Sequence, residues 1–191
     1  MTARCSTAPA LRARLRAATQ HDHQVLDDAL GRLDLADRRD YACFLRVQSR
    51  ARIGVESWLA RCCPPEWLPP AQTGLIEADL AALCCAGVDV LDEDVPAFAH
   101  ANEGPVAWLG AAWVLAGSSL GNRMMERELT GRAPEGWPMQ FLRDETMPAY
   151  FKALRALLAS DEINPGAERT ARAVFAHFSR EADRQLVAIA A

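Results

Sequence analysis

The chain has 191 residues, of which 50% are hydrophobic and 24% are charged, and its formal net charge is −4 with a sequence pI near 5.6. This length and composition are typical of one soluble globular domain with a single core, and the acidic balance argues against a nucleic-acid partner. No apolar run reaches the roughly 18 residues of a membrane span, and the stretch MTARCSTAPALRAR lacks the apolar core of a secretion signal, so we expect a cytoplasmic protein.

The pattern of apolar residues predicts helices throughout and no strands. Residues 1–9 are expected to be a flexible N-terminus, and residues 10–191 one all-α, single-domain bundle. Asp37 is a predicted N-cap, and Gly31, Gly87 and Gly131 are predicted helix ends. The predicted helices cover residues 10–31, 38–61, 71–86, 103–129 and 138–159, and the last begins at the Asn164-Pro165 pair and continues to the C-terminus.

The first predicted helix carries His21 and His23, two of the four histidines in the chain. Residues two apart on a helix diverge by about 200°, so these two cannot ligate one metal from the same face. His23 shares the apolar, core-facing stripe with Leu15, Thr19, Leu26 and Leu30. It is therefore the predicted inward histidine, either as a hydrogen-bonded core residue or as a ligand. Asp27, one turn later, is placed to accept a ring N–H and fix the tautomer.

Six cysteines are present, but Cys62–Cys63 and Cys84–Cys85 are adjacent pairs in apolar surroundings and no CxxC spacing occurs. Neighbouring helical positions point about 100° apart and chelate one metal poorly. We expect reduced, mostly buried thiols, with a metal or redox role as the alternative.

The predicted helix over 103–129 contains glycines and serines that disfavour an interior helical position by up to about 1 kcal/mol each. Gly110, Gly117 and Gly121 lie within about 20° of one line along this helix. A stripe without side chains admits either a closely packed helix or a flat ligand. Ser118 and Ser119 add hydroxyls that can hold water. A planar iron macrocycle between this stripe and His23 would explain both features.

These residues resemble the haem oxygenases. The pattern LR-x-x-T-x-x-x-H-x-x-L-D over residues 15–27 is similar to the proximal-helix signature of that family. The pattern G-x-x-W-V-L-x-G-S-x-L-G over residues 110–121 is similar to its distal-helix signature, closest to the bacterial branch associated with bacteriophytochromes. FKALRALL at 151–158 and AVFAHF at 173–178 fit later helices. The resemblance implies a haem-oxygenase-like helical bundle.

The resemblance also implies roles for individual residues. His23 would be the axial haem ligand, with Asp27 as its acceptor, and Arg16 and Lys152 would be cations facing the propionates. Phe175 would help to wall the pocket. Gly117, Ser118 and Gly121 would form the distal, catalytic side, with Ser119 beside them. Ser118 stands where many members have an aspartate, and Asn122 replaces a second glycine.

The reaction implied is the oxidative opening of haem to biliverdin, carbon monoxide and ferrous iron, with haem as both cofactor and substrate. O2 and an external reductase or ferredoxin would take part, and a bacteriophytochrome is a candidate acceptor of the biliverdin. A haem-binding sensor or carrier without turnover is the main alternative, and a structural helical bundle is another. If His23 is not the ligand, His21 and His177 are the candidates. A di-iron oxygenase is disfavoured because no Asp or Glu lies three residues before any histidine.

Overall fold

The computed structural model describes residues 10–84, 96–101, 104–160 and 164–190, and within these ranges the chain is helical with no strand. The all-α prediction is therefore confirmed. None of the helices found in these ranges is long and apolar enough to cross a membrane. The α-helices are α1 (Leu11–Leu30), α2 (Arg38–Cys62), α3 (Thr73–Cys84), α4 (Trp108–Thr130), α5 (Thr146–Leu154) and α6 (Pro165–Ala190), with 3-10 turns at Pro65–Trp67 and Leu157–Ala159.

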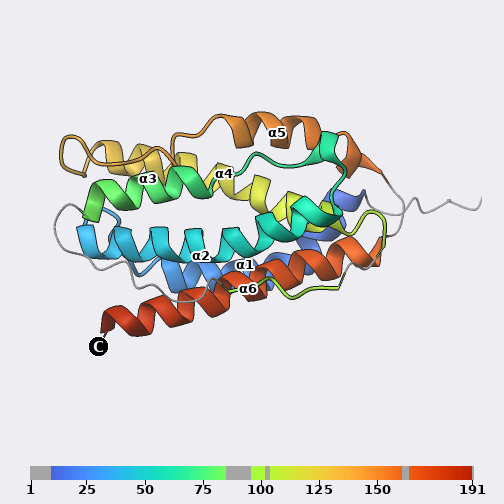
Figure 1. Ribbon diagram of the computed structural model, residues 1–191, viewed down its shortest axis with the longest axis horizontal. Helices are drawn as coiled ribbons and strands as arrows, with labels where there is room; N and C mark the ends of the chain where they lie inside the picture. The colour runs from blue at the N-terminus through green and yellow to red at the C-terminus, as the bar shows by residue number, and fades with distance from the viewer. Residues whose placement is uncertain (1–9, 85–95, 102–103, 161–163, 191) are drawn as a thin grey trace, which may run out of the picture.

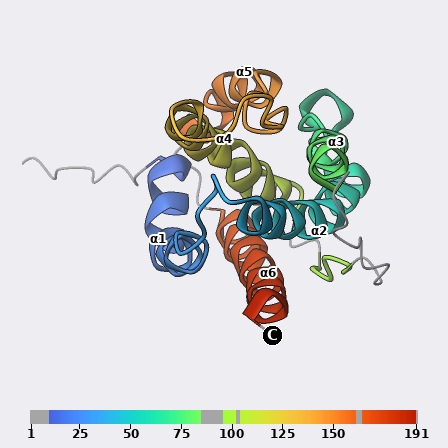
Figure 2. The same cartoon turned by 90° about the vertical axis from the view of Figure 1, so that its left-hand side faces the viewer.

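The long helices run side by side in an elongated bundle (Figure 1). Seen along its length, α1 and α3 lie on opposite sides, and α2, α4 and α6 lie between them (Figure 2). Helix α6 packs against α1, α2 and α4, while α3 packs on α2 and α5 packs on α4. Helix α6 is therefore the main support of α1.

Several helix ends form as the sequence predicts. The Asp37 carboxylate accepts the backbone N–H groups of Arg39 and Asp40 and caps α2. Gly131 follows the end of α4, and Asn164 caps the first turn of α6, where Pro165 takes the first position. Residues 1–9 and Gly87 lie outside the described residues.

The predicted helix over 138–159 is wrong in its first part. Residues 138–145 are non-helical, with turns at 140–143, and α5 runs only from Thr146 to Leu154, with a 3-10 turn at Leu157–Ala159 after it. The buried Asp79 carboxylate of α3 accepts the backbone N–H groups of Gln140 and Phe141, both at 2.9 Å. This long-range contact satisfies backbone donors that a helix would otherwise pair. The helix predicted over 103–129 likewise begins later, at Trp108.

The cysteines that the structure describes follow the expectation of reduced thiols. Cys43 and Cys63 are buried, Cys62 is half-buried, and none of the three is in a disulfide. Burial raises the pKa of Cys63 to about 12, so its reactive thiolate is disfavoured. The Cys85 position and the Cys84 side chain lie outside the described part.

Candidate functional site

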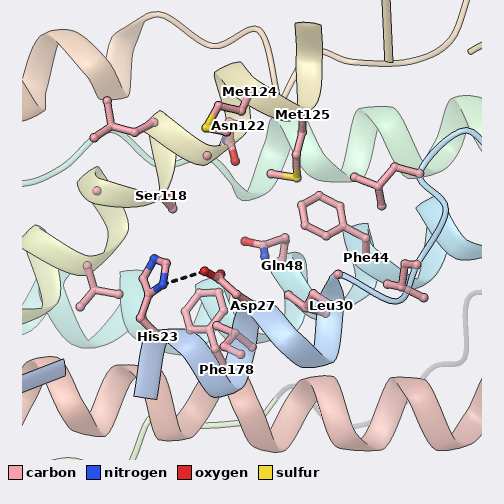
Figure 3. A pocket seen from close by; sticks show the side chains of 18 of the residues that line it. His23, Asp27, Leu30, Phe44, Gln48, Ser118, Asn122, Met124, Met125 and Phe178 are labelled. Carbon is pink, nitrogen blue, oxygen red and sulfur yellow. Dashed lines mark ion pairs between the residues drawn. The ribbon is translucent and has the colours of Figure 1, made fainter. Parts of the chain in front are cut away.

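A cavity of about 680 Å³ lies between α1 and α4, with α2 and α6 closing its sides. This volume falls within the range of about 300–1,000 Å³ that small-molecule sites occupy. Most of its wall is apolar, and one group of polar side chains interrupts it. Figure 3 shows His23 and Asp27 on α1, Ser118, Asn122 and the methionines on α4, Phe44 and Gln48 on α2, and Phe178 on α6.

His23 and Asp27 form the α1 side of the cavity. The His23 Nδ1 lies 2.8 Å from an Asp27 carboxylate oxygen, and the two side chains are 59% and 56% exposed because the cavity is open beside them (Figure 3). The His23 ring also meets Phe175 edge to face, with centroids 5.6 Å apart. With Nδ1 held by the carboxylate, the neutral imidazole carries its lone pair on Nε2. The ring nitrogen that remains available for a further interaction is Nε2.

The predicted apolar stripe of α1 faces inward only in part, since His23, the expected inward histidine, is exposed on the cavity wall and is not a core residue. Leu15 and Thr19 are buried, and Leu26 and Leu30 line the cavity together with His23. His21 is exposed and does not line it. His177 is buried against Phe98 and also lies away from it. Among the histidines that the structure describes, His23 is the one on the cavity wall.

The glycine stripe of α4 divides into two parts with different uses. A Cβ added to Gly110 would overlap the carbonyl oxygen of Ala167, so this glycine allows α6 to pack closely. A Cβ added to Gly117 or Gly121 would meet no atom within 4 Å, and both glycines line the cavity. The glycines of the stripe therefore have two different roles. Gly110 allows close packing of α6, whereas Gly117 and Gly121 leave open space in the cavity that His23 also lines.

Ser118 lies beside these glycines and has its hydrogen bonds fixed by the protein. Its Oγ donates to the Leu115 carbonyl at 2.8 Å and accepts from the Arg52 Nη2 at 2.7 Å. A hydroxyl has one proton and two lone pairs. The Ser118 proton is therefore used in a hydrogen bond within α4, and one lone pair of Oγ is left to accept a hydrogen bond from the cavity.

Arg52 is the functional candidate that the sequence analysis missed. Its side chain is 0% exposed and lines the cavity from α2, with its guanidinium 5.0 Å from the centre of the Phe141 ring. Burial lowers its pKa to about 10, which leaves it charged at neutral pH. A signal for it exists in the sequence, because Gln48, Val55 and Leu59 place Arg52 on the buried stripe of α2.

Three predicted site residues lie elsewhere. Ser119 is 3% exposed, donates to the Ala116 carbonyl at 2.6 Å and does not line the cavity, because it points about 100° away from Ser118 around the helix. Arg16 and Lys152 are exposed on α1 and α5 and do not line it either. The exposed cation that lines the cavity among the described residues is Arg132, which pairs with Asp34 and Glu128.

Comparison with known proteins adds no family to this geometry. No protein-family model matches the chain, and no curated protein matches it significantly. The case for a function therefore depends on the residues of the cavity. They offer one imidazole paired with a carboxylate, two glycines on α4 with open space beside them, and aromatic and aliphatic surfaces. Such a site suits a largely apolar small molecule.

Proposed function

We propose that the protein binds haem between α1 and α4 and that His23 is the axial ligand. The observation that carries the proposal is that the paired His23 and Asp27 on α1 line the same cavity as Gly117 and Gly121 on α4, beside which there is open space. An imidazole whose Nδ1–H is held by a carboxylate is more basic at Nε2 and keeps one ring orientation. The open space above the two glycines leaves room for the ring and for a small molecule on its far face.

The remaining walls fit a porphyrin by shape and polarity. Leu26, Phe175 and Phe178 supply apolar surface on the His23 side. Gln48 and Asn122 add amides near Ser118 on the other side, where they can hold water. Haem itself would supply a redox-active iron and an oxidisable macrocycle. The protein would orient the ring, limit the access of water and arrange hydrogen bonds over one face.

Under this proposal the reaction is that of a haem oxygenase, which converts haem to biliverdin, carbon monoxide and ferrous iron with O2. An external reductase or ferredoxin would supply the electrons, and a bacteriophytochrome is a candidate acceptor of biliverdin. Two sequence patterns support this assignment, the one that contains His23 and Asp27 and the one that contains Gly117, Ser118 and Gly121. Both patterns meet at the same cavity.

A non-catalytic haem carrier is the second candidate, and one observation favours it. The Ser118 proton is directed at the Leu115 carbonyl, so Ser118 accepts from the cavity and does not donate to it. Turnover would then require protons from water, which the amides of Gln48 and Asn122 would hold by hydrogen bonds. A carrier would need none.

Titration of the purified protein with hemin, followed by its Soret absorption, tests binding. We expect a saturable one-to-one complex whose spectrum changes in His23→Ala and stays the same in His21→Ala, a matched control on the exposed face of α1. A spectrum that His23→Ala leaves unchanged would refute the axial assignment. Addition of a reductant and O2 then separates the two functions: bilin absorbance and carbon monoxide indicate an oxygenase, and a persistent Soret band indicates a carrier.

A further inference from the structure

Arg52 is a buried charge with most of its donors unused. A guanidinium has five N–H donors. Arg52 uses one at the Ser118 hydroxyl (2.7 Å) and a second, longer one at the side-chain amide oxygen Oε1 of Gln48 (3.4 Å). Its Nη1 is buried and has no hydrogen-bond partner among the described residues. A buried cation in this state is costly unless a ligand or a nearby negative charge compensates it.

The carboxylates closest to Arg52 face away from the cavity. Glu56 and Asp144 act on its charge from the side of the α2–α3 connection, where both hydrogen-bond Gln72. Neither lines the cavity, and no ion pair to Arg52 is present in the described ranges. On the cavity side, therefore, no protein carboxylate is paired with the guanidinium.

Gln48 adds donors at the same place. Its amide oxygen accepts from Arg52, because the opposite orientation would set two donor groups against each other. This turns its NH2 group away from the guanidinium. Gln48 is 8% exposed and lines the cavity beside Ser118 (Figure 3). Arg52 thus fixes the orientation of the Gln48 amide, with the oxygen on the side of the guanidinium.

We propose that Arg52 and Gln48 form a subsite, on the α2 wall of the cavity, for an anionic group of the bound ligand or for a small anion beside it. The charge lies next to an apolar space from which water is largely displaced on binding, where electrostatic attraction is stronger than at the surface. The amide supplies directed donors to the same group. The subsite does not depend on the ligand being haem.

Two fluorescent probes with the same ring system test the proposal on the protein without added haem. Anilinonaphthalene sulfonate is anionic, and N-phenylnaphthylamine is its neutral counterpart. We expect tighter binding of the sulfonate, and we expect Arg52→Met to weaken the sulfonate about tenfold while the neutral probe is unaffected, since a hydrogen bond to a charged group contributes about 1.5–3 kcal/mol. Gly121→Leu, which places a side chain in the cavity, should weaken both probes.

A second variant and a control complete the test. Gln48→Glu keeps the shape of the side chain and should also abolish the preference for the sulfonate, because the new carboxylate neutralises Arg52. This variant tests the subsite if Arg52→Met does not fold. Arg132→Met removes the exposed, already paired cation of the same cavity and should leave the preference unchanged.

Equal affinities in the unmodified protein would overturn the proposal, as would a preference that survives in Arg52→Met or Gln48→Glu. An equal loss in Arg132→Met would also overturn it. Hemin titration of the same preparation keeps the two proposals apart. If the protein prefers the sulfonate but does not bind hemin, the proposed function is refuted and the anion subsite stands. If it binds hemin but shows no preference for the sulfonate, the subsite is refuted and the proposed function stands.

Discussion

Replacing Gly117 by alanine should make the protein more stable and at the same time weaken its binding of haem. Gly117 is an interior residue of α4, and glycine at such a position is less favourable than alanine by about 1 kcal/mol. The new methyl group would meet no protein atom within 4 Å, so nothing offsets this gain. For a chain of this length about 1 kcal/mol corresponds to a rise in Tm of about 2–4 °C.

Gly110→Ala is the matched control on the same helix. The propensity gain is the same, but the methyl group would overlap the Ala167 carbonyl oxygen, so α4 and α6 must separate. We expect a loss of stability of about 1–3 kcal/mol, as for other overpacked sites. The two substitutions should therefore change stability in opposite directions.

Thermal and urea denaturation of the protein without haem measure both effects, and a hemin titration of Gly117→Ala measures the cost to binding. The expected pattern is a higher Tm together with a weaker hemin complex. A lower Tm for Gly117→Ala would show that the space beside it is already filled by protein. A higher Tm with unchanged hemin affinity would show that no ligand lies against this face of α4.

Three further results are expected. Asp79→Asn should lower the free energy of unfolding in urea by about 1–3 kcal/mol, because an amide cannot accept both backbone N–H groups that the carboxylate holds. Ser118→Ala should destabilise the protein by a similar amount, since it leaves the buried Arg52 Nη2 without its hydrogen-bond partner. Ser118→Cys, whose thiol is a weaker acceptor, should have a stability between those of the unmodified protein and Ser118→Ala. Burial lowers the pKa of His177 below 6.5, so the unfolded chain binds a proton at this histidine more strongly than the folded protein does. The free energy of unfolding should therefore fall as the pH drops below 6.5. In a pH series of denaturation curves, His177→Gln should make this dependence on pH less steep.

The sequence predicts those parts of the fold that depend on neighbours in the chain. The Asp37 cap, the end of α4 at Gly131 and the start of α6 at Pro165 are local signals, and all three form. The non-helical segment over 138–145 was not predictable in this way. It depends on the Asp79 carboxylate, which lies about sixty residues earlier in the chain.

The candidate site divides along the same line. The contact between His23 and Asp27 is an i,i+4 contact and could be predicted. The different uses of Gly110 and Gly117 could not, because they depend on where α6 crosses α4. Arg52 was missed because charged residues are rarely fully buried, and only its place on an apolar stripe indicated otherwise.

The attachment of α1 has a consequence for the width of the cavity. Leu11 and Leu15 are buried, and two ion pairs, Arg14–Glu168 and Arg172–Asp22, join α1 to α6. Helix α1 packs mainly on α6 and on the 3-10 turn at Leu157–Ala159, and α4 lies on the other side of the cavity. The width of the cavity therefore depends on how α1 packs on α6, and not on how α2, α4 and α6 pack with one another.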